Sequence, residues 1–216
     1  MWYVIQTTTG KEDELVDAIE NILAGSRQSN IYKRCFTIYR ECIWRIEGEF
    51  RLRIEPLFPS YVFAETDNPD AFFIALKQVP RLSKLLGVED IFWSVGEEEE
   101  RFLRDLVEMA DTVAGENDET GAGRENDIKE WKWKRRDGSP NGGKTERYLV
   151  RRSLVQVDSE GQIVSAEGVL KNYMNRIVKQ RLRKRSVIIE IPFMGEMRRV
   201  QLGIRLEEDE MLLVGI

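Results

Sequence analysis

Apolar positions recur at two spacings along the first half of the chain, every second residue in some runs and at helical spacing in others. The predicted strands are Trp2–Gln6, two strands within Cys35–Ile54 that turn at Glu47-Gly48, and Tyr61–Glu65. The predicted helices begin near Lys11, at Pro69 behind an Asn68 N-cap, and at the acidic run Glu97–Glu100. Strands and helices mixed over about 110 residues indicate a compact α+β domain.

After Tyr148 the pattern changes to short β-rich runs separated by turns. These runs are Leu154–Val157, Ile163–Ser165, Ile177–Lys179, Val187–Ile191 and Val200–Leu202. They predict a small five-stranded β-barrel. Gly, Asn, Asp, Glu and Lys dominate the stretch between the two patterns. The sequence therefore predicts a domain over residues 1–112, a linker or insertion over 113–150 and a second domain over 151–216.

Two rings and a proline stand together in Leu57-Phe58-Pro59-Ser60-Tyr61, just before an apolar strand. Successive residues of a strand point to opposite faces, so Phe58, Tyr61 and Phe63 cannot all lie on one side. Either all three are core or turn residues, or some ring surface is left for a partner, since aromatic side chains dominate binding hot spots.

Charge is distributed unevenly over a chain whose net charge is −5. Residues 1–114 carry 13 Lys and Arg against 21 Asp and Glu, whereas residues 171–205 carry 10 against 2. Nine of these ten cations form the candidate site, namely Lys171, Arg176, Lys179, Arg181, Arg183, Lys184, Arg185, Arg198 and Arg199. They predict nucleic-acid binding through phosphate contacts. The alternative is a charged barrel exterior that protects edge strands from aggregation.

Composition also narrows the function classes. Histidine is absent, which removes the commonest general base and zinc ligand, and Cys35 and Cys42 do not form a metal-binding pair. We expect no enzymatic activity, metal or cofactor. Neither a membrane-spanning run nor a signal peptide is evident, so we expect a cytoplasmic protein without a membrane partner.

Two motifs fall in the stretch between the predicted domains. Gly138–Thr145 has the letters of a Walker A motif, but Trp131–Arg136 precedes it and is no buried strand, so we expect no nucleotide site. Trp131–Arg136 itself interleaves two indoles with four cations. It could stack on bases, press on anionic lipid, or form an ordinary hairpin with solvated charges.

Several segments together resemble the NusG family of transcription elongation factors. The N-terminal likeness rests on Trp2–Gln6, Thr9–Glu12, Leu57–Phe63 and Val79-Pro80-Arg81. The C-terminal likeness to a KOW motif rests on Glu167–Lys171 and Asn175–Val178, followed by Phe193-Met194-Gly195. Within the family the chain is most similar to the LoaP antiterminators. The resemblance implies an antiparallel sheet with flanking helices (an NGN-like domain) joined to a five-stranded, SH3-like KOW barrel.

The resemblance also implies partners. Gln6, Phe58, Tyr61 and Phe63 would bind the clamp helices of bacterial RNA polymerase, and Arg81 would lie near non-template DNA. The basic barrel of a monomeric protein would bind a nascent RNA hairpin, which makes the expected function processive antitermination. Met194 stands where NusG proteins carry a ring that docks on a ribosomal protein or Rho, so we expect neither partnership. The alternative is an RNA-binding or ribosome-associated KOW protein with no polymerase role.

Overall fold

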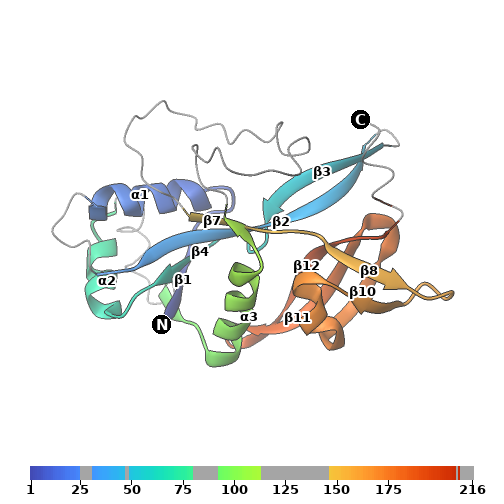
Figure 1. The fold of residues 1–216 in the computed structure, drawn as a ribbon. Coiled ribbons are helices and arrows are strands. Elements are labelled where there is room, and N and C mark those ends of the chain that lie inside the picture. Colours follow the sequence, from blue (N-terminus) through green and yellow to red (C-terminus); the bar gives the residue numbers. More distant parts are fainter. Residues whose placement is uncertain (25–30, 47–48, 80–91, 113–145, 208, 210–216) are drawn as a thin grey trace.

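The computed structural model describes residues 1–24, 31–46, 49–79, 92–112, 146–207 and 209. It confirms the predicted α+β class, with a seven-stranded sheet that carries helices and a separate five-stranded sheet (Figure 1). We call these the N-terminal sheet and the C-terminal sheet.

The N-terminal sheet has the strand order β5-β1-β4-β2-β7-β6, with β3 paired to β2 in a long hairpin. Its neighbours are antiparallel except β2 and β7, which are parallel. The elements are β1 (Trp2–Gln6), α1 (Glu12–Ala24), β2 (Arg34–Ile46), β3 (Glu49–Pro56), β4 (Tyr61–Glu65), α2 (Pro69–Leu76), β5 (Phe92–Ser94), α3 (Glu97–Glu108), β6 (Asp111–Thr112) and β7 (Glu146–Val150).

The predicted helix starts are confirmed at the level of single hydrogen bonds. The Asn68 side chain accepts a bond from the amide of Ala71 at 3.2 Å, and Pro69 follows it at the start of α2. At the start of α3 the Glu99 side chain accepts from the amide of Gly96 at 2.8 Å. Both contacts satisfy groups that a helix end leaves without an intrahelical partner.

The C-terminal sheet has the order β10-β11-β12-β8-β9, and its five strands contain the five predicted runs. They are β8 (Ser153–Val157), β9 (Ile163–Ala166), β10 (Ile177–Arg181), β11 (Ser186–Phe193) and β12 (Glu196–Arg205), with the 3₁₀ segments η1 (Gly168–Arg176) and η2 (Leu182–Lys184) on either side of β10. The edge strands β9 and β10 approach each other, because the Ile163 amide donates to the Gln180 side chain at 3.1 Å. The sheet therefore curls into a partly closed barrel.

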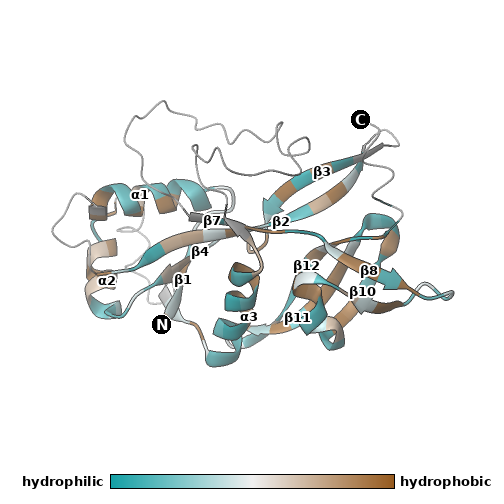
Figure 2. Ribbon diagram, viewed as in Figure 1, coloured by the Kyte–Doolittle hydropathy of each residue, from teal (hydrophilic) through white to brown (hydrophobic). Residues whose placement is uncertain are grey.

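The two faces of the N-terminal sheet have different covers. Ile5, Val62 and Ala64 pack on one face against residues of α1 and α2. Val4 and Phe63 lie on the other face, in a cluster that also contains α3 and most of the C-terminal core. The alternation of hydrophilic and hydrophobic residues along β2 and β3 is visible in Figure 2. One hydrophobic cluster thus joins the two sheets.

The link between the sheets is short. The predicted linker range, 113–150, includes β7, which the structure places inside the N-terminal sheet beside β2. Only Arg151 and Arg152 separate β7 from β8. The segment 113–145 consequently connects β6 to β7, two strands of the same sheet, and does not lie between the sheets in the chain.

Candidate interaction site between the two sheets

A tight turn before β4 positions the first ring of the predicted site. The Tyr61 amide donates to the carbonyl oxygen of Phe58 at 3.2 Å, with Pro59 and Ser60 in between. Ser60 has φ of 72°, the left-handed conformation that a type II turn requires at this place. The buried Glu12 carboxylate accepts from the Ser60 amide at 2.7 Å and so holds the turn.

The four predicted polymerase-binding residues lie close together. Gln6 and Tyr61 are direct partners across β1 and β4, and Phe63 pairs with Val4 two residues along. Phe58 meets Phe63 edge to face, with 5.4 Å between ring centroids. Gln6 is exposed and Tyr61 is partly buried, whereas Phe58 and Phe63 are buried. We call Phe58, Tyr61 and Phe63 the ring cluster.

A ring from the C-terminal sheet covers this cluster. Phe193, at the end of β11, stacks on Phe58 at 5.1 Å and meets Tyr61 edge to face at 5.8 Å. Its centroid is 6.3 Å from that of Phe63, and Phe193 is 1% exposed. Met194 and Gly195, both with positive φ, form the two-residue turn that presents Phe193. The three rings therefore lie on one face of the sheet, contrary to the expectation from strand alternation, because Tyr61 and Phe63 are two residues apart and Phe58 lies in the preceding turn; Phe193 covers them from within the molecule.

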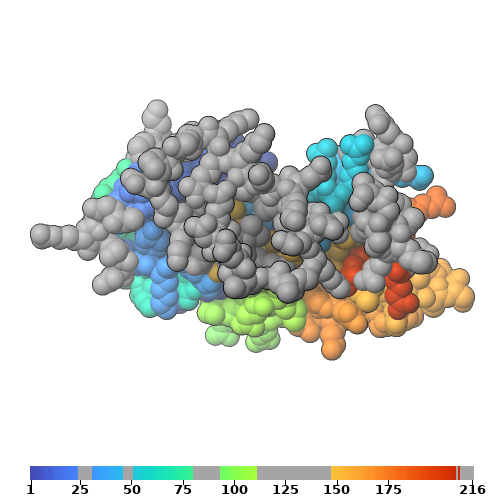
Figure 3. Space-filling model, turned by 45° about the horizontal axis from the view of Figure 1, so that its top comes forward, coloured from blue at the N-terminus to red at the C-terminus, as the bar shows by residue number. Residues whose placement is uncertain are grey.

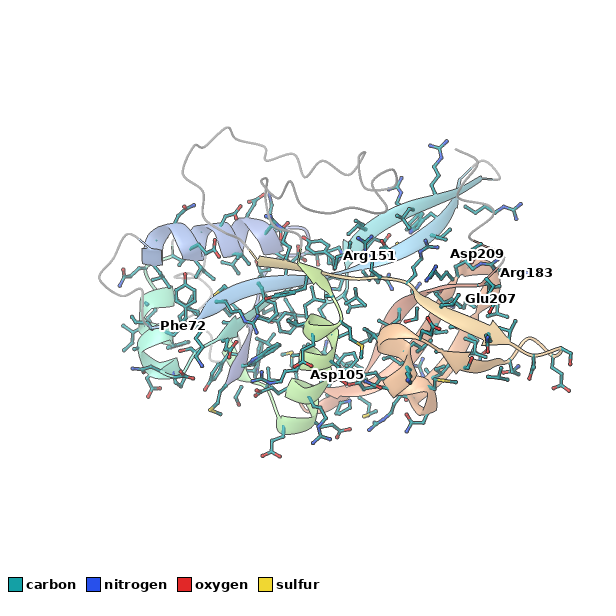
Figure 4. The ribbon with its side chains drawn as sticks, in the orientation of Figure 1. Phe72, Asp105, Arg151, Arg183, Glu207 and Asp209 are labelled. Atoms are coloured by element: carbon teal, nitrogen blue, oxygen red, sulfur yellow. The ribbon has the colours of Figure 1, made fainter. Side chains whose placement is uncertain are left out.

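Helix α3 supplies polar contacts around the rings. The Tyr173 hydroxyl donates to the Asp105 carboxylate at 2.7 Å, and its ring meets Phe102 edge to face at 4.9 Å. Asp105 is labelled on α3 in Figure 4, and Figure 3 shows α3 (green) side by side with C-terminal residues (orange). Burial, and then the Asp105 carboxylate, raise the pKa of Tyr173, so its hydroxyl stays protonated and remains a donor.

Two arginines of the C-terminal sheet also reach the N-terminal sheet. Arg176 forms an ion pair with Glu98 at 2.5 Å. Arg198 donates to the Tyr61 hydroxyl at 3.0 Å, and its guanidinium carbon lies 5.7 Å from the centroid of that ring. Both arginines belong to the predicted RNA-binding set, so part of that set is engaged between the sheets.

A second contact joins the sheets where β12 crosses β2. Arg40 donates to the carbonyl oxygen of Gln201 at 2.6 Å. A Cβ atom on Gly203 would overlap the carbonyl oxygen of Glu41, because the two backbones touch. The Glu41 side chain is buried and pairs with both residues of the link, Arg151 at 2.5 Å and Arg152 at 3.6 Å. Gly203 is therefore the residue that allows this approach.

Six of the other seven predicted RNA-binding cations are exposed or half-buried, and the seventh, Arg185, is buried. Lys179, Arg181, Arg183 and Lys184 line an open hollow formed by β10 and η2, and Arg183 lies well away from Asp105 in Figure 4. Lys171 and Arg199 are also exposed, with Arg199 paired to Glu190 at 2.9 Å.

Arg185 is placed differently from its neighbours. It is 9% exposed and its guanidinium binds the Asp209 carboxylate at 2.7 to 2.9 Å. The side chain has turned inward from the hairpin tip, where Arg185 itself has φ of 47°. In this conformation Arg185 supports the tip and does not present its charge to a ligand.

Arg81 and the two motifs Trp131–Arg136 and Gly138–Thr145 lie outside the described residues. In the described part of the chain no group of three or more His, Cys, Asp or Glu residues is placed to hold a metal ion. Cys35 and Cys42 are buried, and burial raises the pKa of the Cys42 thiol to about 11. None of the described helices has the length and apolar character that a membrane crossing needs.

Sequence reasoning did not assign Tyr173, Asp105 or Gly203 to a site. Gly203 carries a usable signal, because a lone glycine inside a strand pattern indicates a bulge or a close backbone approach. Tyr173 and Asp105 carry none. An acidic residue on an amphipathic helix is indistinguishable from an ordinary solvated one until the fold brings a donor to it.

Known proteins similar to the N-terminal part of the chain are transcription factors. Residues 1–104 match the family model described as "Transcription termination factor nusG". The "Transcription termination/antitermination protein NusG" of Helicobacter pylori strain 26695 is 30% identical over 90 residues, and that of strain J99 is 28% identical over 88. Each match covers 40% of this chain, and the chain spans about half (49%) of the length of these curated relatives.

One solved structure extends over nearly the whole chain. It is titled "Domain interaction in Thermotoga maritima NusG", is 16% identical, and aligns over 94% of this chain and 93% of its own with a TM-score of 0.43. In the present structure the chain forms a seven-stranded sheet that carries helices, followed by a small five-stranded sheet. Residues 1–104 are therefore similar to the NusG family, over slightly less than half of the chain.

Proposed function

We propose that this protein is a NusG-like transcription termination/antitermination factor that acts as a specialised, LoaP-like processive antiterminator. Its N-terminal domain would bind the clamp helices of bacterial RNA polymerase through Gln6, Phe58, Tyr61 and Phe63. Its basic C-terminal domain would bind nascent RNA. In keeping with a family of transcription factors, the proposal includes no enzymatic step.

The observation that carries the proposal is the family match over residues 1–104, which includes the whole ring cluster. The geometry adds support, because three rings on one face beside the exposed Gln6 form a surface suited to an apolar helix face. A factor that bridges the polymerase clamp needs only to bind the closed, elongating state more tightly than the paused state. A difference of about 1–3 kcal/mol would change their ratio roughly 5- to 150-fold.

RNA binding draws on different residues. The hollow at β10 and η2 gathers Lys179, Arg181, Arg183 and Lys184, and these side chains are exposed or half-buried. Clustered cations bind phosphate by releasing counterions, and arginine can also stack on bases. The proposal also includes Arg81 as a residue that would lie near non-template DNA.

Phe193 and the polymerase would compete for the ring cluster. Because Phe193 already stacks on Phe58, the C-terminal sheet must move away before another protein can contact these rings. The measured Kd for polymerase would then be the Kd of the open form divided by the fraction of molecules that are open.

The test is a binding titration with purified bacterial RNA polymerase, followed by terminator read-through assays. Tyr61→Ala removes a partly buried ring and the hydroxyl that Arg198 binds, so this variant loses a hot-spot side chain and one of the contacts that hold the C-terminal sheet in place. We expect polymerase affinity to fall at least about tenfold. Ile74→Ala, which removes an exposed apolar side chain of α2, is the control and should bind normally. Tyr61→Ala binding as tightly as the parent would refute the assignment.

The basic hollow also favours a second candidate, an RNA-binding or ribosome-associated protein with no polymerase role. The same titration separates the two. RNA binding without polymerase binding, in both the parent and an open variant, would select the second candidate.

A further inference from the structure

We propose that the outer end of the β2–β3 hairpin, residues 41–46 and 49–54, binds RNA, with Trp44 stacked on an unpaired base while the basic hollow holds nearby phosphates. We call this end of the hairpin the ribbon. The inference rests on the proposed function and assigns the side chain that would distinguish one transcript from another.

The ribbon extends beyond the rest of the N-terminal sheet. β2 pairs with β4 over Arg34–Phe36 and with β7 over Phe36–Arg40. Beyond Arg40 its only partner among the described strands is β3, in a register that runs to Ile46 opposite Glu49 (Figure 1). Successive side chains of a strand alternate between two faces. The ribbon can therefore be packed on one face and leave side chains of the other face to solvent.

The outer part of the ribbon carries an exposed indole. Glu41 and Ile43 share one face and are buried, whereas Trp44, on the other face, is 50% exposed. Among the residues whose side chains the structure describes, Trp44 is the only exposed aromatic one. It lies directly opposite Arg51, and the guanidinium carbon of Arg53 is 5.5 Å from the centroid of its ring. A cation thus covers part of the indole, and half of the side chain is left for a partner.

The charges around Trp44 favour a nucleic acid as that partner. The exposed side chains described on the ribbon are Trp44, Arg45, Arg51 and Arg53. The Glu41 carboxylate is buried and paired with Arg151, while Glu47 and Glu49 lie outside the described side chains. A protein-binding hot spot is surrounded by contacts that exclude water, whereas guanidiniums around an indole suit phosphates around a base.

The basic hollow lacks what the ribbon supplies. Its described lining runs from Lys179 to Lys184 and contains four cations, Gln180 and Leu182, but no ring. Phosphate contacts position a protein on RNA and carry no sequence information. Unpaired bases are recognised by stacking on aromatic rings and by hydrogen bonds to their edges. Of the described side chains, Trp44 is therefore the one best suited to tell one RNA from another.

The ribbon and the hollow are neighbours in the structure. η2, which lines the hollow, approaches β2. Gly203 touches the backbone of β2 at Glu41, and it pairs with Ser186, two residues after the end of η2. Neighbouring strands lie about 4.8 Å apart, so two such steps place the ribbon on the order of 10 Å from the hollow. One RNA hairpin with an unpaired tail can reach both.

The test measures the affinity of the full chain for fluorescent RNA hairpins that share one stem. The first hairpin carries a tail of about six unpaired adenosines, within the site size of single-strand binders. The second carries an abasic tail with the same phosphates. We expect the parent to bind the adenosine tail at least about fivefold more tightly than the abasic tail, because only the first can stack. A single-stranded DNA of the tail sequence, which has no stem for the hollow, should bind more weakly than either.

Variants of Trp44 separate stacking from a structural role. Trp44→Ala should abolish the preference for the adenosine tail and leave the affinity for the abasic tail unchanged, because the phosphates are the same. Trp44→Phe keeps an aromatic ring and should keep part of the preference. Ile74→Ala, which removes another exposed apolar side chain, should keep all of it.

Variants of the arginines test the phosphate contacts. Arg51→Gln combined with Arg53→Gln should weaken binding of both tailed hairpins and lower the salt dependence by a slope of roughly 0.7 for each lost contact. The matched control is Lys77→Gln with Arg101→Gln, two exposed cations outside the ribbon and the hollow, which changes the net charge equally. The control should keep the salt dependence of the parent.

Any of three results would overturn the proposal and leave the proposed function intact. These are equal binding of the adenosine and abasic tails, a preference that survives in Trp44→Ala, and Trp44-dependent binding of the DNA strand as tight as that of the tailed hairpin. Loss of polymerase binding in Trp44→Ala, with the RNA preference unchanged, would assign the ribbon to a protein contact instead. Failure of the parent to bind any RNA hairpin would remove RNA from the proposed function and the role of the ribbon with it.

Discussion

The two faces of the N-terminal sheet are built differently. The face under α1 and α2 is covered by aliphatic and aromatic side chains from neighbouring elements of one domain, and Asp13 of α1 also binds Thr37, Tyr39 and Arg147 of the sheet. The face under α3 and the C-terminal sheet combines stacked rings with charged and hydroxyl contacts, such as Arg198 to Tyr61 and Tyr173 to Asp105. The α3 face differs because much of its cover comes from the other sheet, and contacts of this mixed kind between domains resemble those of interfaces that separate.

The comparison indicates which contacts stabilise the fold of the N-terminal domain and which hold the two sheets against each other. Loss of a side chain under α1 leaves a cavity that nothing fills, whereas loss of one between the sheets lets them move apart. Variants on the two faces should therefore differ in kind as well as in size.

The largest effect should come from the face under α1. Ile19 is fully buried there, and Ile19→Ala should lower the free energy of unfolding by about 2–5 kcal/mol. Urea denaturation followed by circular dichroism measures it, with the exposed Ile74→Ala as control. If the free energy of unfolding stays within about 1 kcal/mol of that of the parent, the side chains under α1 contribute no more to the stability of the fold than those between the sheets.

Phe193→Ala should disturb the arrangement more than the fold. It removes the ring that stacks on Phe58 and meets Tyr61 edge to face, and we expect it to weaken closure by about 2–4 kcal/mol. Small-angle scattering should show a larger radius of gyration while the circular dichroism spectrum stays close to that of the parent. Loss of all cooperative structure would show instead that the two sheets fold as one unit.

A smaller change tests one polar contact. Tyr173→Phe keeps the ring against Phe102 but leaves Asp105 without its hydroxyl donor, which should weaken closure by about 1 kcal/mol. Energy transfer between dyes on Met109→Cys and Glu167→Cys, two exposed sites next to α3 and η1, should fall modestly in this variant. Tyr32→Phe, on the face that contains Phe72, should leave transfer unchanged.

The smallest effect is a dependence on alkaline pH. Closure raises the pKa of Tyr173 from the ordinary value of 10.0, chiefly by burial. A raised pKa means that closure is at full strength below about pH 10 and weakens as pH rises through the pKa of the closed form. Energy transfer in the parent should fall in this range more than in Tyr173→Phe. Identical profiles would show that Tyr173 does not titrate between the two forms.

Most of the fold could be predicted because its signals are local. Alternation predicts β1 and β4, and Asn68 with Pro69 predicts the start of α2. β5, β6 and β7 could not be predicted this way: the first two are only three and two residues long, and β7 follows a stretch without periodicity. Their pairing with distant strands decides their structure, and a local pattern does not record it.

The candidate site shows the same limit. Phe58, Tyr61 and Phe63 were predicted as a group, and the structure does bring them together. That Phe193 covers them depends on the path of the 129 residues between Phe63 and Phe193 and on the absence of a side chain at Gly203. Arg185 gives the converse case: its sequence neighbours predict an exposed charge, but Asp209, distant in sequence, draws it inward.

The two-residue link at Arg151 and Arg152 determines how effectively any partner can compete with the C-terminal sheet for the ring cluster. A C-terminal sheet tethered so closely never diffuses away from the ring cluster, and its effective concentration is on the order of millimolar. A free protein at cellular concentration competes poorly against such a neighbour. A competitor that is itself held beside the factor, as RNA emerging from a polymerase is held beside that polymerase, also has a high effective concentration and can compete with the C-terminal sheet.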